Sequence, residues 1–274
     1  MSKSEHNPPR HFIAINYHTF HGIEDVLKCV RSVILSARGM TGTVKTVLFY
    51  HSDQPPQQPF LDQMEAMPLE VMHLPNGTNG DCLNDQIMQA RGYDYFYRVD
   101  ADDLVSEGRF CWQAEQFVTT GCDISGGGLI YKNRITGQEY QVIPPAAPAS
   151  MAFLMNQFFL HPTLAFRLES FNRAHIRYGC ERLEDKGLAV TVVRAGLDVV
   201  NDPRIYGVYN LNPDARNGSK FNILSLKYNL SFIFAKRSYW AIPLAGGVFM
   251  VSYIFSKERL RRFRHLLTRK TDQV

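Results

Sequence analysis

YFYRVDADD, from Tyr95 to Asp103, is the stretch that decides the fold. Its first residues are mostly aromatic or β-branched, which is typical of a buried strand. The strand leads into Asp100, Asp102 and Asp103, three carboxylates within four residues. Like charges so close together repel one another, so this pattern predicts a positively charged partner at the end of the strand.

Upstream of this stretch, strand and helix patterns alternate. Apolar runs predict strands at Phe12–Asn16, Val44–Tyr50 and Leu69–Leu74. Apolar residues at helical spacing predict a helix at 23–34 and another at 82–92. Strands separated by helices predict a parallel sheet with right-handed crossovers, which binds ligands at the carboxyl ends of its strands. The acidic cluster lies at such an end.

Downstream of the acidic cluster the pattern becomes irregular. The expected elements are a helix at 109–118, a glycine-rich hairpin at 124–143, a short strand within 161–167, helices at 170–179 and 182–196, and a strand at 198–200. Apolar content rises from Phe221 onward. We therefore predict one domain over residues 1–220 and a separate C-terminal segment over 221–274.

Composition is typical of a globular protein in a reducing compartment. Of the 274 residues, 45% are hydrophobic and 20% are charged, which allows a substantial core. The five cysteines are scattered without a C-x-x-C pair, which disfavours a disulfide framework or a zinc site. MSKSEHNPPR, at the N-terminus, has no apolar run and predicts no signal peptide.

The net charge of +4 conceals an uneven distribution. Between Lys257 and Lys270, seven basic residues and one glutamate give the tail a net charge of +6, which leaves −2 for all other residues. A nucleic-acid groove would need positive charge spread over one folded face. We therefore expect no nucleic-acid partner.

A divalent cation is the natural partner of the clustered carboxylates. Mg²⁺ and Mn²⁺ take oxygen ligands, usually one or two carboxylates together with substrate phosphates. Asp100 and Asp102 can both turn toward one ligand if the backbone bends after the strand. The alternatives are a solvated acidic turn or a cap for the following helix.

The order of further motifs resembles that of inverting family-2 glycosyltransferases with the GT-A fold. NGTNGDCLNDQIMQARGYDYFYRVDADD matches the family's Asn- and Gly-containing loop, Asn-bearing helix and strand ending in D-A-D-D. HPTLAFR, RLEDKGLAVTVVRAG and YNLNPDARNGS are similar to its H-P-T segment, E-D helix and late loop. The matches run in family order from about Phe12 to Ser219.

This resemblance implies an α/β, GT-A-like fold with a mixed, mostly parallel central sheet flanked by helices. It implies transfer of a hexose or N-acetylhexosamine from a nucleotide-diphosphate-sugar donor, expected to be a UDP-sugar, with inversion. The implied acceptor is a glycan or a lipid-linked saccharide, the setting is bacterial surface polysaccharide synthesis, and the cofactor is Mg²⁺ or Mn²⁺.

The resemblance also implies roles for the acidic residues. Asp100 would lie near the donor ribose and, with Asp102, contact the metal. Asp185 would be the base that deprotonates the acceptor hydroxyl, with Glu184 as a supporting contact. Without the family, an E-D pair in the first turn of a helix is a surface feature that the helix dipole favours.

Other residues are candidates for binding donor or acceptor. The implied donor-binding residues, besides Asp100, are Asn16, Asp53, Asn84 and Arg98. Arg98 lies two residues before Asp100 and shares its face, which predicts a salt bridge to the acidic cluster, with a diphosphate contact as the alternative. His161, in HPT, is either a packed loop residue or a contact for the acceptor.

Three positions depart from the family pattern. YHSDQPP retains Ser52 and Asp53 but lacks the acid that usually precedes them. Leu83 stands where a positive residue is common, and Asn212 where a histidine is common. These departures concern the donor base and a third metal contact.

The C-terminal segment has the composition of a membrane-associating extension. Ser238 to Ser256 holds 19 uncharged residues, about 28 Å as a helix, but Pro243 and Gly246-Gly247 interrupt it. A single span would place the basic tail opposite the cytoplasmic domain, against the positive-inside rule. We predict peripheral or monotopic attachment to the cytoplasmic face of the inner (plasma) membrane. A true span and a buried partner-binding helix are the alternatives.

Two other functions fit a sheet of this kind. A nucleotidyltransferase would need a glycine-rich, basic phosphate loop after the first strand, and INYHTFHG offers none. A non-catalytic, membrane-associated scaffold that retains the fold is the other alternative.

Overall fold

The computed structural model of the chain describes residues 7–18, 22–146, 158–179, 183–211, 219–237 and 239–246. Within them, nine strands form one sheet in the order β3-β2-β1-β4-β8-β6-β9-β5, and β7 pairs with β6 outside this path. The strands are β1 (Arg10–His18), β2 (Thr43–His51), β3 (Glu70–Leu74), β4 (Tyr95–Asp100), β5 (Leu104–Val105), β6 (Ile124–Asn133), β7 (Glu139–Val142), β8 (Ala165–Arg167) and β9 (Val199–Leu211).

The sheet combines a parallel half with a half of mixed direction. β1 pairs in parallel with β2 and β4, and β3 extends β2 in the same direction. In this register Asn16, at the end of β1, lies opposite Asp100, at the end of β4. β6 and β9 are also parallel, whereas β8 is antiparallel to β4 and β6, β7 to β6, and β5 to β9. The predicted α/β fold with a mixed sheet is confirmed.

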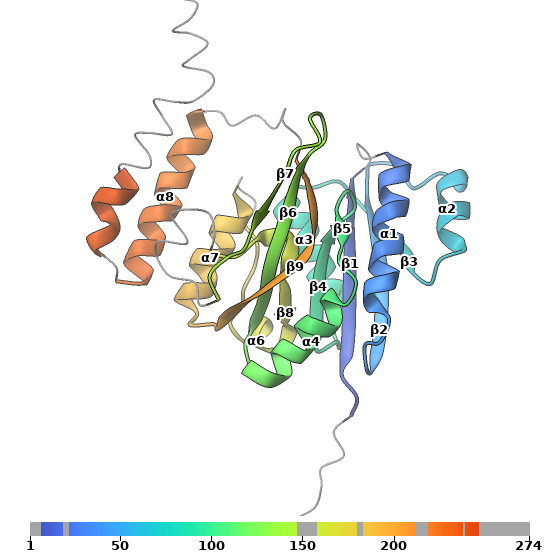
Figure 1. Cartoon of the computed structure of the whole chain (residues 1–274), viewed down its shortest axis with the longest axis horizontal. Helices are drawn as coiled ribbons and strands as arrows, with labels where there is room; N and C mark the ends of the chain where they lie inside the picture. Colours follow the sequence, from blue (N-terminus) through green and yellow to red (C-terminus); the bar gives the residue numbers. More distant parts are fainter. Residues whose placement is uncertain are drawn as a thin grey trace, which may run out of the picture.

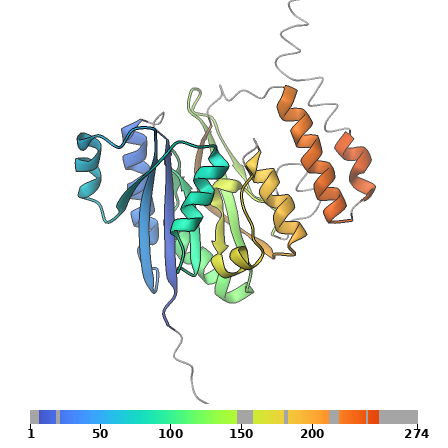
Figure 2. The same ribbon diagram turned by 180° about the vertical axis from the view of Figure 1, so that it is seen from behind.

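Helices cover both faces of this sheet (Figures 1 and 2). They are α1 (Ile23–Ala37), α2 (Gln58–Glu65), α3 (Asn79–Gln89), α4 (Arg109–Thr120), α6 (Leu168–Arg173), α7 (Glu184–Arg194) and α8 (Ser219–Ala235), with 3₁₀ turns η1 (His161–Thr163) and η2 (Tyr239–Ala241). α1 and α4 lie on one face, and α3, α6 and α7 lie on the other.

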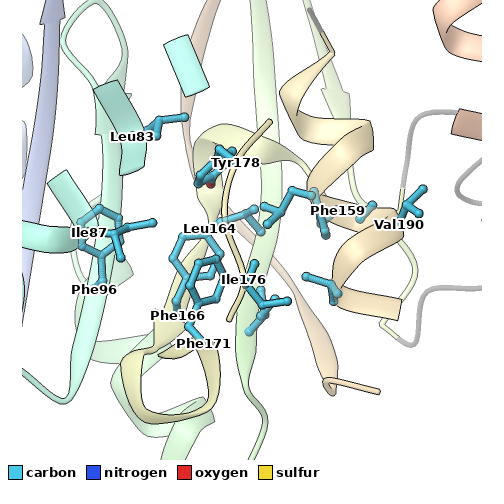
Figure 3. Close-up of a cluster of buried hydrophobic side chains, with 14 of the residues drawn as sticks. Leu83, Ile87, Phe96, Phe159, Leu164, Phe166, Phe171, Ile176, Tyr178 and Val190 are labelled. Atoms are coloured by element: carbon cyan, nitrogen blue, oxygen red, sulfur yellow. The ribbon is translucent and has the colours of Figure 1, made fainter. Parts of the chain in front are cut away.

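Successive side chains of β1 enter two different core clusters, one on each face of the sheet. Phe12 and Ala14 join the cluster under α3, α6 and α7, whereas Ile13 and Ile15 join the cluster under α1 and α4. Successive side chains of a strand point to opposite faces, so a continuous apolar run is what a strand buried on both faces requires. Figure 3 shows the first cluster, which joins α3 to α7.

β9 is much longer than the strand predicted at 198–200, because the sheet accommodates a proline. The register with β6 shifts where Gly127 pairs with Asp202 and Gly128 with Ile205, which leaves Pro203 and Arg204 out of the ladder. Such a bulge is one of the few places where a sheet accepts proline, which cannot donate a ladder hydrogen bond.

Three further elements differ from the prediction. α2 and β5 were not predicted, since α2 buries only Phe60 and Met64, and β5 has two residues. The helix expected at 170–179 is shorter and ends at Arg173. His175, with φ of 51°, has left the right-handed helical region.

The end of the described chain packs on α7. Phe232 and Ile233 of α8 are buried in the same cluster as Leu188 and Val192 of α7. The boundary predicted at residue 220 falls just inside α8, which begins at Ser219, and the division of the chain stays a prediction. No helix in the described ranges is long and apolar enough to cross a membrane. Asn212, most of the 238–256 run and the basic tail lie outside those ranges.

Candidate active site

The carboxyl ends of β1 and β4 place Asn16 beside the acidic turn. The backbone N–H of Ala101 donates to the carbonyl of Asn16 at 3.0 Å, which continues the parallel ladder of β1 and β4 into the acidic turn. The buried amide of Asn16 accepts from Nε2 of Gln86 at 2.9 Å and donates to Oδ1 of Asn79 at 3.5 Å. Both partners belong to α3, so side-chain amides join this helix to the end of β1, which lies beside the acidic turn.

Asp100 has a buried positive partner. Nη2 of Arg98 donates to both carboxylate oxygens, at 2.7 and 2.8 Å, and the two side chains are 3% and 18% exposed. The predicted salt bridge is present, and the alternative diphosphate contact stays a prediction. Arg109, which the sequence did not single out, donates through Nη2 to the carbonyl of Arg98 at 2.9 Å. Burial lowers the pKa of Arg109 to about 10.

Asp102 has a different, more exposed partner. Its Oδ2 accepts from Nη2 of Arg134 at 3.2 Å, and 20% of its side chain is exposed. Arg134 lies in the turn between β6 and β7, and its Nη1 reaches Oδ2 of Asp25 in α1 at 3.1 Å. The sequence analysis missed Arg134, because nothing in the hairpin turn indicates a partner 32 residues away.

Asp103 is buried and contacts β9. Its Oδ1 accepts from the backbone N–H of Asn210 in β9 at 3.1 Å. Burial raises the pKa of Asp103 well above its usual range, and the negative charges of Asp100 and Asp102 raise it further. The surroundings of Asp103 therefore disfavour its charged form.

Glu184 and Asp185 form the first turn of α7. Leu183, with φ of 70°, precedes them and turns the chain into the helix. Nδ2 of Asn79 donates to Oε1 of Glu184, so Asn79 contacts both Asn16 and the predicted catalytic turn. Sequence reasoning missed Asn79, although Thr78 and Asp81 form a capping box that fixes the start of its helix.

The carboxyl of Asp185, the predicted base, has a raised pKa. Its Oδ1 accepts from the backbone N–H of Lys186 at 2.7 Å. Burial raises the pKa of the Asp185 carboxyl, and the charge of Glu184 contributes in the same direction. A carboxylate with a raised pKa holds a transferred proton more readily than an ordinary aspartate does.

Lys186 connects this turn to α8. Its buried Nζ donates to Oγ of Ser225 at 2.9 Å and to Oδ1 of Asn229 at 3.0 Å. Burial lowers the pKa of Lys186 to about 8. The helix that begins with the predicted base is therefore fixed to the C-terminal helix by a polar contact.

Asn84 and His161 both contact Tyr178, whereas Asp53 lies apart from them. The amide of Asn84 is engaged by the backbone of Tyr178, donating to its carbonyl at 3.0 Å and accepting from its N–H at 2.9 Å. Nε2 of His161 lies 3.1 Å from the Tyr178 hydroxyl, and burial lowers the pKa of His161 well below its usual range. Both contacts favour packing roles over ligand binding. Asp53 is exposed just beyond the end of β2.

The described carboxylates could hold a divalent cation only together with ligands from a substrate. The described ranges contain no group of three His, Cys, Asp or Glu side chains that could enclose a metal. Arg98 engages both oxygens of Asp100, which favours Asp102 over Asp100 as a metal ligand. One carboxylate completed by substrate phosphates is a usual environment for Mg²⁺, and this arrangement fits it.

Known structures share this fold. No protein-family model and no curated protein matches the chain. Residues 1–349 of S. aureus TarS, in complex with UDP-GlcNAc, are 14% identical, with a TM-score of 0.64 over 91% of this chain and 74% of that one. Another TarS structure gives 13% identity and a TM-score of 0.61, and the chain spans only 44% of its length.

A mannosyltransferase is similar as well. PcManGT from Pyrobaculum calidifontis, in complex with GDP-Man and Mn²⁺, is 11% identical, with a TM-score of 0.58 over 96% of this chain and 81% of that one. At such identities the likeness concerns the fold alone. The chain has an α/β fold with a mixed central sheet that resembles those of GT-A glycosyltransferases.

Proposed function

We propose that the protein is an inverting glycosyltransferase that uses a nucleotide-diphosphate-sugar donor. One observation carries the proposal: Asn79 links the edge of the sheet that bears Asp100 to the turn that bears Glu184 and Asp185. The acidic turn that we assign to the donor and the carboxylate that we assign to the acceptor thus lie on elements joined by Asn79, in a fold similar to those of TarS and PcManGT. TarS is known in complex with UDP-GlcNAc and PcManGT in complex with GDP-Man, which supports a nucleotide-sugar donor for this protein.

The acidic turn would receive the donor. The leaving group is a nucleoside diphosphate, and Mg²⁺ or Mn²⁺ would stabilise the negative charge that develops on it. Asp102 would hold the cation, because its carboxylate is partly exposed and its arginine partner lies in a hairpin turn. Asp100 would face the donor ribose, held in place by Arg98.

Asp185 would act on the acceptor. Its carboxylate would accept the proton of the attacking hydroxyl, and the raised pKa of Asp185 favours that transfer. Glu184 would orient the turn through its bond with Asn79. Attack from the face opposite the departing diphosphate inverts the anomeric carbon.

The finer features of the proposal come from the sequence. We infer a UDP-sugar donor carrying a hexose or N-acetylhexosamine, and a glycan or lipid-linked saccharide acceptor. We place the protein in bacterial surface polysaccharide synthesis, at the cytoplasmic face of the inner membrane. Peripheral or monotopic attachment would involve the segment 221–274, whose uncharged run and net +6 tail suit an anionic lipid surface.

Donor turnover and transfer test the proposal. The purified protein should transfer sugar from one member of a UDP- and GDP-sugar panel in the presence of Mn²⁺. Asp102→Ala should lose donor turnover, and Asp185→Asn should lose about 10²–10⁴-fold in transfer while still showing a donor-induced thermal shift. Asp62→Asn, in the exposed part of α2, is the matched control and should change neither activity.

The alternatives give different results in the same assays. A nucleotidyltransferase would release pyrophosphate from a nucleoside triphosphate and a sugar phosphate. A scaffold would show neither turnover nor donor binding. Full transfer by both folded variants, Asp102→Ala and Asp185→Asn, would refute the assigned roles.

A further inference from the structure

Arg134 makes three contacts that join separate parts of the fold. Its Nη1 lies 3.1 Å from Oδ2 of Asp25, and its Nη2 lies 3.2 Å from Oδ2 and 3.4 Å from the backbone carbonyl of Asp102. Asp25 belongs to the first turn of α1, and Arg134 to the turn between β6 and β7. A guanidinium is therefore shared between the acidic turn and a helix that has no part in the proposed chemistry.

We propose that Arg134 is an internal counter-ion that competes with a divalent cation for Asp102. The inference rests on the proposed function, in which Asp102 holds the metal. A guanidinium and a metal ion on one carboxylate repel each other, and an oxygen that accepts from Arg134 is a weaker ligand for the metal. Arg134 neutralises Asp102 until the cation arrives, and then withdraws.

The exposure of the contact allows this exchange. The side chains of Arg134 and Asp25 are 36% and 38% exposed, and that of Asp102 is 20% exposed, so water can replace the bonds that break. Ion pairs of this kind are weak, and salt screens them. The pair formed by Arg98 and Asp100 lacks this property, because the Arg98 side chain is only 3% exposed.

Asp25 gives the withdrawn arginine a second partner. Arg134 already bonds to Asp25 through a different nitrogen, so it can leave Asp102 without losing all of its partners. The neighbouring hairpin contact is independent, since Nζ of Lys132 pairs with Oε1 of Glu139 at 2.8 Å. The hairpin therefore has a bond of its own that does not depend on Arg134.

Binding of Mn²⁺ in the presence of saturating UDP, whose phosphates complete the site, tests this competition directly, and a protein-free titration corrects for the Mn²⁺ that UDP holds in solution. Electron paramagnetic resonance of free Mn²⁺ gives the dissociation constant without any turnover. Arg134→Ala should tighten Mn²⁺ binding about two- to fivefold at low salt, the range expected for removing an exposed ion pair. The gain should shrink as salt concentration rises. Lys132→Ala removes the same charge from the same hairpin and should leave the constant unchanged.

A double-mutant cycle separates direct competition from a general charge effect. Asp25→Asn should weaken Mn²⁺ binding in the wild-type background, because Arg134 then bonds to Asp102 alone. In the Arg134→Ala background the same substitution should have little effect. An equal effect in both backgrounds would overturn the proposal, as would unchanged or weaker binding in Arg134→Ala. Circular dichroism and thermal unfolding of each variant verify the fold.

Failure of this inference is distinguishable from failure of the proposed function. If neither the wild type nor Arg134→Ala binds Mn²⁺, both the competition and the metal assignment are wrong. Sugar transfer in a chelator would then still support a glycosyltransferase. If Mn²⁺ binds equally well to wild type and Arg134→Ala, the competition alone is wrong.

Discussion

Asp100→Ala should destabilise the protein strongly, because it leaves the Arg98 guanidinium without its anionic partner. Arg98 is 3% exposed, and its Nε and Nη1 find no hydrogen-bond partner among the described residues. Its Nη2 makes two charge-assisted bonds to Asp100, at 2.7 and 2.8 Å. Breaking a buried ion pair by removing one member costs about 3–5 kcal/mol, and we expect a loss of that size.

Arg98 and Asp100 are unequally buried, so removing one or the other should cost different amounts of stability. Arg98→Met leaves Asp100, which is 18% exposed and can be solvated, so we expect a smaller loss of about 1–3 kcal/mol. The double variant should be more stable than Asp100→Ala alone, because it leaves no unpaired buried charge. Asp102→Ala removes a partly exposed partner and should cost less than about 1 kcal/mol.

Urea unfolding followed by circular dichroism gives the free energy of unfolding of the wild type and of each of the four variants. A loss below about 1 kcal/mol in Asp100→Ala would refute the reasoning, and so would a double variant as unstable as the sum of the two single changes. The experiment also bears on mechanism. Inactivity of Asp100→Ala would reflect a damaged fold as much as a lost ligand, whereas Asp102→Ala isolates the proposed metal contact.

Three further outcomes are expected. Gly80→Ala should lower the free energy of unfolding by about 1–3 kcal/mol, because the added Cβ would lie 2.1 Å from the carbonyl oxygen of Gly179. An unchanged Tm would contradict that close approach. Asp185 has a raised pKa, so the fold favours its protonated form and loses stability as pH rises above about 3.9 toward the folded pKa. Asp185→Asn should therefore unfold at higher urea than wild type at pH 7 and at the same urea near pH 3, and a constant difference would rule this out. Lys186→Ala should cost about 1–3 kcal/mol by leaving the buried Asn229 amide short of a donor, while Lys28→Ala, on the exposed side of α1, should be neutral.

The parallel half of the sheet could be predicted because its pattern is local. FIAIN, VKTVLFY and YFYRVD are apolar enough to indicate strands buried on both faces, and parallel pairing brings their carboxyl ends to one edge. The proximity of Asn16 to Asp100 follows from that geometry. β9 was predicted only in part, because its bulge at Pro203 depends on a partner strand that the local sequence does not reveal.

Apart from Arg98, the partners of the acidic residues could not be predicted, for the same reason. Asn79 contacts Glu184 across 105 residues, and Arg134 contacts Asp25 across 109. Neither residue stands out locally, because an asparagine in a turn and an arginine in a hairpin are common. The acidic cluster has the positively charged partners that its sequence predicts, Arg98 in β4 and Arg134 in the turn between β6 and β7. Only Arg98 lies within the stretch that raised the question.

The join between β1 and α3 consists of carboxamides. Asn16, Gln86 and Asn79 carry no ionisable group, so their mutual bonds do not change with acidity. Hydrogen bonds made by ionisable side chains at these positions would weaken or strengthen as the side chains gained or lost protons. The hydrogen bonds between the end of β1 and α3 should therefore persist across the range of pH in which Asp185 changes its ionisation.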